Sequence, residues 1–102
     1  MIVYNTTIKV DATIAPQWLQ WLHQTYAPAM LATGCFWKYQ VLHLLELDDS
    51  DGPTYAIQYY AHTPAHYELF RDSFAHELQQ QATGRWGDRF VLFSTLMQVM
   101  TA

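Results

Sequence analysis

The sequence predicts a small α+β domain, and three observations lead to this prediction. Residues 2–10 present two alternating sets of side chains with a period of two, as a strand does. Two later segments begin with a threonine and have a proline in the following turn, a typical start of a helix: Thr13 with Pro16, and Thr63 with Pro64. Between these helices an acidic turn at residues 48–53 separates two strand-like segments, which favours a hairpin.

The first half of the chain is expected to form a strand, a helix and a second strand. The helix takes Thr13 as its N-cap, is kinked by Pro28 and is capped by Gly34. Its buried side is expected to comprise Ile14, Trp18, Trp21, Leu22, Thr25 and Ala29. The second strand follows at residues 36–47 and is apolar on both faces in its middle.

The second half is expected to form a strand, a helix and a last strand. The third strand covers residues 54–61, and the helix after Thr63 ends near residues 84–87. One face of that helix carries Tyr67, Phe70, Phe74, Leu78 and Ala82. The last strand covers residues 89–100. The order β-α-β-β-α-β over residues 1–102 predicts one ferredoxin-like domain, a four-stranded antiparallel sheet with both helices on one face.

Composition narrows the classes of partner. The chain has a net charge of −4 with only five Lys and Arg, so we expect neither nucleic acid nor an anionic membrane surface as a partner. Its single cysteine, Cys35, excludes an internal disulfide framework and fits a reducing compartment. The N-terminus lacks the basic and long apolar regions of an export signal, and we expect a cytoplasmic protein.

The apolar content predicts a second copy as partner. Hydrophobic residues make up 51% of the chain and charged residues 14%. The second and last strands are apolar on both faces, whereas the helices can cover only one face of the sheet. Most soluble oligomers are symmetric, so we expect a homodimer that packs through the free sheet face.

Several segments together resemble a known bacterial family. In chain order they are Met1–Asn5, Trp18–Leu22, Pro28–Phe36, Thr54–Tyr59, Arg85–Val91 and Thr95–Met97. They are similar to the domain of unknown function numbered 4286, a family of short stand-alone proteins. The resemblance covers essentially the whole chain and implies a ferredoxin-like domain of the dimeric α/β-barrel type. It implies no established activity and no catalytic residues. Ser94 stands where we expect a basic residue in this family.

Individual residues offer few signs of catalysis. His62 and His66 are separated by a helix start and have no third ligand nearby in sequence, so no metal site is expected. Cys35 is expected to be a packed residue at the end of a helix. The third strand has tyrosines but no Lys or Arg, unlike an RNA-binding strand. Arg85, Asp88 and Arg89 are expected to form an ion pair before the last strand, with an arginine at the mouth of a cleft as the alternative.

Two functions of different classes remain open, and the sequence leaves undecided whether the protein is an enzyme. The first is a non-catalytic homodimeric binding or interaction module, with polar side chains such as Asn5, Thr7, Gln58, Tyr60 and Ser94 on the free sheet face. The second is a cofactor-free monooxygenase or isomerase that acts on a small organic molecule between sheet and helices. We expect no cofactor. The ligand-binding candidates are Asn5, His23, Tyr26, Trp37, His43, Gln58, Tyr60 and Arg89, and Trp21 is of the type that an enzyme pocket would need.

Overall fold

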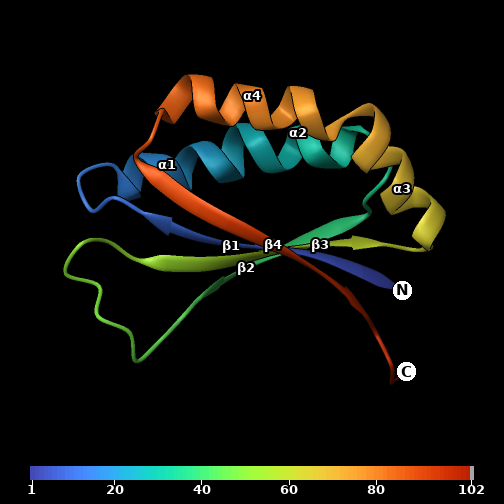
Figure 1. The fold of residues 1–102 in the computed structure, drawn as a ribbon, viewed down its shortest axis with the longest axis horizontal. Coiled ribbons are helices and arrows are strands. Elements are labelled where there is room, and N and C mark those ends of the chain that lie inside the picture. The colour runs from blue at the N-terminus through green and yellow to red at the C-terminus, as the bar shows by residue number, and fades with distance from the viewer. Residues whose placement is uncertain (102) are drawn as a thin grey trace.

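The computed structural model describes residues 1–101 and shows an α+β fold with one antiparallel sheet in the order β2-β3-β1-β4. Helices cover one side of the sheet, and the other side is open (Figure 1). The strands are β1 (Ile2–Val10), β2 (Lys38–His43), β3 (Thr54–Ala61) and β4 (Phe90–Gln98). The helices are α1 (Ala15–Trp21), the π-helix η1 (Leu22–Tyr26), α2 (Ala27–Ala32), α3 (Pro64–Ser73) and α4 (Ala75–Trp86).

The sheet register separates a helix-covered face from an open face. Tyr4 of β1 lies opposite Tyr59 of β3 and Leu96 of β4, and this row faces the helices. The next row, Asn5 with Gln58 and Thr95, faces the opposite way. Five polar residues were predicted to lie on the open face. Four of them do: Asn5, Thr7, Gln58 and Tyr60. Ser94 is the exception: it pairs with Thr6 on the helix side, and its hydroxyl lies 3.2 Å from that of Tyr4.

The core lies between the helices and the inner face of β1 and β3. Its most completely buried large side chains include Trp18, Leu22, Met30 and Ile57. Cys35 is buried beside Phe36 and is a free thiol, as the sequence predicts for a packed residue. Burial of these apolar side chains is the main favourable contribution to folding.

The first helical segment departs from the predicted helix at a π-turn. An α-helical pattern places Thr25 on the buried side with Trp18 and Leu22, but Thr25 is exposed. The π-helix at Leu22–Tyr26 adds a residue to the turn and rotates the following side chains, so that Ala27 and Met30 are buried instead. Pro28 then lies in the first turn of α2, where its missing N–H is tolerated, and Gly34 ends the segment with φ +79°.

The second helical segment begins as predicted and is divided at Phe74. The Thr63 side chain accepts a hydrogen bond from the backbone N–H of His66, which caps the start of α3. Phe74 has a non-helical φ of −127°, and α4 begins directly after it. Phe70, Leu78 and Ala82 nevertheless all face the core, as their spacing predicts.

The second strand is shorter than predicted. It spans Lys38–His43, and the apolar residues after it belong to a long connection to β3 that we call the hairpin arm, residues 44–53. The hairpin arm and the last described residues, 99–101, which we call the C-terminal arm, project beyond the open face of the sheet (Figure 1). Each arm carries exposed apolar side chains: Leu45 and Leu47 on the first, Val99 and Met100 on the second. Of the apolar run predicted for the second strand, Val41 and Leu42 lie in β2, whereas Leu44, Leu45 and Leu47 lie on the hairpin arm.

Strand β4 is exposed on both faces. Val91 and Phe93 face the open side, where the helices do not reach. Leu92 and Leu96 point to the helix side and are also about half exposed, at 45% and 51%. Helix α4 therefore does not seal this edge of the sheet. In residues 1–101 there is no helix with the length and apolar character needed to cross a membrane.

Candidate functional site

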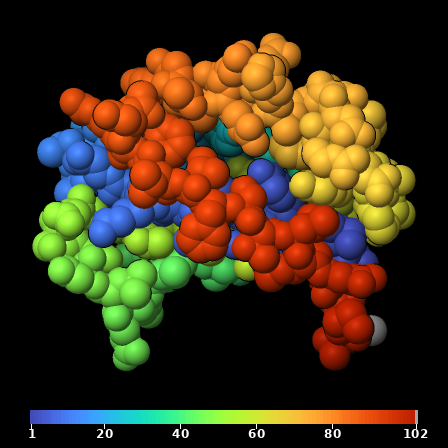
Figure 2. Space-filling model, viewed as in Figure 1, coloured from blue at the N-terminus to red at the C-terminus, as the bar shows by residue number. Residues whose placement is uncertain are grey.

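An apolar cleft lies between the helices and the sheet, along the edge formed by α4 and β4. The surface is hollowed between α4 and β4, and atoms from earlier in the chain form the bottom of the hollow (Figure 2). The inner part of the cleft has a volume of about 40 Å³ and the outer part about 430 Å³. Both parts are lined by Tyr26, Gln79, Ala82, Phe90 and Leu92. The cleft exists because α4 stands away from β4 while the core beneath is closely packed.

Strands β1 and β3 form the floor of the inner part, and the first helical segment forms its back wall. Tyr4, Thr6 and Ile8 come from β1, and Tyr59 comes from β3. The back wall consists of Trp18, Trp21, Leu22, Tyr26 and Met30. Tyr26 is the last residue of the π-helix and stacks on Trp21, with ring centroids 4.9 Å apart. Single π-turns occur frequently at functional sites, and this one brings Tyr26 into the cleft.

Three tyrosine hydroxyls belong to this cleft. The hydroxyl of Tyr4 is hydrogen-bonded to Ser94. Burial, and secondarily the neighbouring phenol of Tyr4, raises the pKa of Tyr26 to about 12. Burial likewise raises the pKa of Tyr59, with smaller contributions from the phenols of Tyr26, Tyr4 and Tyr39. At neutral pH Tyr26 and Tyr59 are therefore uncharged phenols, able to donate a hydrogen bond.

The predicted candidates Asn5, Gln58 and Tyr60 gather on the open sheet face, away from the cleft. The Tyr60 hydroxyl lies 3.1 Å from Oε1 of Gln58 and 3.3 Å from Oε1 of Gln40. Asn5 donates from Nδ2 to Thr7, while its Oδ1 is buried without a hydrogen-bond partner. An unsatisfied buried acceptor is costly, and within residues 1–101 this atom has no partner.

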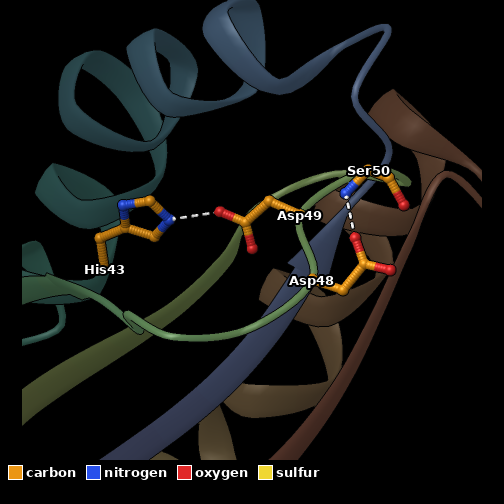
Figure 3. Close-up of polar contacts among 4 residues, drawn as sticks. All are labelled: His43, Asp48, Asp49 and Ser50. Atoms are coloured by element: carbon orange, nitrogen blue, oxygen red, sulfur yellow. Dashed lines mark hydrogen bonds and ion pairs between the residues drawn. The ribbon is translucent and has the colours of Figure 1, made fainter.

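The predicted histidine candidates lie on the surface and not in the cleft. Nδ1 of His23 is 2.8 Å from the hydroxyl of Tyr39. His43 ends β2, and its Nε2 lies 3.1 Å from Oδ2 of Asp49, across the hairpin arm (Figure 3). In the same arm the backbone N–H of Ser50 donates to Asp48 and lowers the pKa of that carboxyl. These contacts order the start of the hairpin arm.

Trp37 and Arg89 lie at two other surface positions. The indole of Trp37 stacks on His62, with ring centroids 5.1 Å apart, and Nζ of Lys38 lies 4.8 Å from the Trp37 ring. Arg89 lines a polar depression together with Lys9, Asp11, Asp51 and Asp88. The predicted ion pair among Arg85, Asp88 and Arg89 is wrong: within residues 1–101 none of them forms one, and the Arg85 guanidinium lies over the Trp86 ring at 4.0 Å.

The structure therefore brings only Tyr26 of the eight predicted candidates into the cleft, together with Trp21. The sequence reasoning did not name Tyr4, Gln79 or Tyr59 as ligand-binding candidates. The sequence did contain a sign that Tyr4 and Tyr59 belong to a site. Both occupy helix-facing positions of predicted strands, where a hydroxyl on an otherwise apolar face is unusual. Their meeting depends on the register between β1 and β3.

The sheet order and the helix layer define the protein as a ferredoxin-like α+β protein, and solved structures agree. A dimeric ferredoxin-like protein from an uncultured marine organism matches with a TM-score of 0.70 at 11% identity, covering 99% of this chain and 96% of that one. An ethyl tert-butyl ether D (EthD) family protein from Bacillus halodurans matches with a TM-score of 0.66 at 14% identity, covering 98% and 100%. No curated protein sequence matches the chain. The model of the domain of unknown function DUF4286 matches residues 1–100, and the chain belongs to this family.

Proposed function

We propose that this protein is a homodimeric binding module whose cleft between α4 and β4 takes a small, largely apolar molecule. The observation that carries the proposal is the cleft itself, open at the sheet edge and continuous with the helix–sheet core. Its outer part has the volume of typical small-molecule sites, about 300–1,000 Å³. Its lining combines aromatic and aliphatic side chains with a few polar groups, the usual composition of a ligand pocket.

A second copy is proposed to cover the open sheet face. Val91, Phe93 and Met97 of β4 expose apolar surface there, and both arms extend it. A two-fold arrangement lets each protomer place its arms around the other. Two βαββαβ domains packed in this way form a dimeric α/β barrel, and the marine ferredoxin-like structure is itself described as dimeric.

The predicted candidates then divide between two roles. Tyr26 belongs to the ligand cleft, whereas Asn5, Gln58 and Tyr60 belong to the dimer interface. His23, Trp37, His43 and Arg89 lie outside the cleft lining and receive no role in ligand binding. We place the protein in the cytoplasm, because its one cysteine is a buried free thiol.

The alternative is a cofactor-free monooxygenase or isomerase that uses the same cleft. A histidine beside the pocket, held by a hydrogen-bonded partner, would favour it. Three histidines have such partners, His23 with Tyr39, His43 with Asp49 and His66 with Thr63, and all three lie outside the cleft lining. Binding uses only groups that line the cleft, and we therefore propose it in place of catalysis.

Saturable binding of naphthalene tests the proposal, with the fluorescence of the cleft tryptophans as the readout. We expect naphthalene to change this emission saturably in the wild-type protein. Ala82→Leu, which narrows both parts of the cleft, should abolish the saturable change. The matched control Ala32→Leu enlarges an exposed alanine of α2 and should bind as the wild type does. A wild-type protein without saturable binding, or an Ala82→Leu variant that binds normally, rules the cleft out as a ligand site.

The assembly is tested separately by light scattering after gel filtration. The expected mass at micromolar concentration is twice that of the chain, whose own mass is 11.9 kDa. A monomeric mass across that range removes the proposed dimer but leaves the cleft proposal standing.

A further inference from the structure

The inner part of the cleft differs from the outer part in both size and chemistry. Tyr4 and Tyr59 line only the inner part, and Tyr26 lies at the boundary because it lines both. The Tyr4 hydroxyl already has Ser94 as its hydrogen-bond partner. For Tyr26 and Tyr59, burial and neighbouring phenols account for the raised pKa, and no hydrogen bond contributes. Tyr26 and Tyr59 thus both line the inner part of the cleft, and within residues 1–101 neither phenol forms a side-chain hydrogen bond.

We propose that this end of the cleft receives an uncharged oxygen acceptor, a carbonyl or ether oxygen, carried by an aromatic ligand, with Tyr26 and Tyr59 as its hydrogen-bond donors. The inference rests on the proposed binding function and specifies the class of ligand. A phenol O–H that faces an apolar pocket without a protein acceptor can donate to a ligand oxygen, and this hydrogen bond favours a ligand that carries one.

The lining requires a neutral ligand head. Among the described residues, the polar groups of the inner part are tyrosine hydroxyls, two indole N–H groups, Thr6 and Gln79, and none carries a charge. A carboxylate or ammonium group placed there would lose its hydration without gaining an opposite charge, which costs far more than hydrogen bonds from phenols return. Charged ligands are therefore excluded by desolvation.

The two volumes determine how the ligand lies. About 40 Å³ accommodates about three water-sized groups at about 10–15 Å³ each, which is enough for a carbonyl with its methyl group but not for a ring. A ring system fits the outer part of about 430 Å³. There it meets Phe90 and Tyr26, whose rings allow offset or edge contacts with an aromatic ligand. The ligand enters with its oxygen first and leaves its rings near the mouth.

Three naphthalene derivatives of similar shape test this inference. The first is 2-acetylnaphthalene, the second is 2-isopropenylnaphthalene, in which a CH₂ group replaces the carbonyl oxygen, and the third is the anion 2-naphthoate. We expect the ketone to bind about fivefold more tightly than the hydrocarbon, the effect of one net hydrogen bond. We expect the carboxylate to bind at least about tenfold more weakly than the ketone because of its desolvation.

The variant Tyr26→Phe/Tyr59→Phe isolates the two hydroxyls. It should bind the hydrocarbon as the wild type does and lose the preference for the ketone. Tyr39→Phe is the matched control, because that hydroxyl is bonded to His23 outside the cleft lining, and this variant should keep the preference. The infrared C=O stretch of bound ¹³C-labelled ketone needs no variant: hydrogen bonding lowers its frequency relative to hydrocarbon solvent.

The outcomes separate the two proposals. Failure of both neutral probes to bind overturns the proposed function and, with it, this inference. Equal binding of ketone and hydrocarbon, or an unshifted C=O stretch, overturns the inference while the binding function stands. Binding of 2-naphthoate as tight as that of the ketone also overturns it, because the end of the cleft would then accept a charge.

Discussion

Replacement of Phe93 by serine gives the sharpest test of the proposed interface. Phe93 lies in the middle of β4 on the open face and is 63% exposed in the single chain. A phenylalanine side chain offers about 200 Å², so about 130 Å² is available for a partner to cover. At about 25 cal/mol per Å² this corresponds to at most about 3 kcal/mol per protomer, and a two-fold dimer contains the residue twice.

The substitution Phe93→Ser should therefore raise the dimer dissociation constant at least about 30-fold, which corresponds to about 2 kcal/mol. It should hardly change the stability of the separate protomer, because most of this side chain is already exposed to water. Sedimentation velocity over a concentration series measures the dissociation constant, and urea unfolding of the monomeric fraction measures protomer stability.

The matched control is Leu69→Ser. Leu69 is 51% exposed, but it belongs to α3 in the helix layer and does not contribute to the open face. This variant should dimerise as the wild type does. Equal dissociation constants for Phe93→Ser and the wild type would refute the assignment of the open face. Equal weakening in both variants would refute it too, since the effect would then not depend on the face.

Three further predictions follow from other parts of the structure. Removal of the residues after Gln98 should weaken the dimer in the same sedimentation assay, because the apolar C-terminal arm is lost; an unchanged dissociation constant would exclude that arm from the interface. Gly52→Ala should lower the free energy of unfolding by at least about 3 kcal/mol, because the added Cβ would lie 1.8 Å from the carbonyl oxygen of Val10. The control Gly34→Ala, at φ +79° with nothing within 4 Å of the added Cβ, should lower it by only about 1–2 kcal/mol. Equal losses for the two variants in urea unfolding would contradict the clash. Tyr26 has a folded-state pKa of about 12, above its ordinary value of 10.0, so its contribution to stability is fully present below about pH 10 and is lost as the pH rises towards 12. Tyr26→Phe should therefore show a shallower alkaline loss of stability in urea titrations, and an identical loss would show that this phenol is not buried in solution.

Some helices and strands could be predicted from the sequence with their exact bounds, and others could not. Strands β1 and β3 have the bounds that the sequence predicts, because alternation and flanking turns are local signals. The cap at Thr63 is local in the same sense, since its side chain accepts from the backbone N–H of His66, three residues further on. The end of β2 was not predictable in this way: its apolar continuation resembles a strand, but after His43 only the backbone N–H of Leu44 still bonds to β3, through Thr54.

The candidate site was predictable only at its back wall. Tyr26 was named as a ligand-binding candidate and Trp21 as a pocket residue type, but five residues apart they do not share an α-helical face, and the π-turn is what makes their rings stack. Tyr4 and Tyr59 are separated by more than half of the chain and meet through the pairing of β1 with β3. Their joint role therefore depends on register, which no short segment of sequence specifies by itself.

The sequence by itself determined the α+β class, the bounds of β1 and β3, the helix start at Thr63 and the excess of apolar surface; the first helix was predicted with Thr13 as N-cap, whereas its N-cap is Ile14 without a side-chain cap. These properties follow from side-chain period, from turn and cap residues and from composition, all of which act over a few residues. Tertiary structure decided the π-turn that places Tyr26, the distance of α4 from β4 and hence the cleft. It also decided which apolar residues remain on the open face and on the arms. The physical reason is packing: a helix settles where its buried side chains fit the sheet, and that fit depends on contacts between segments far apart in the chain.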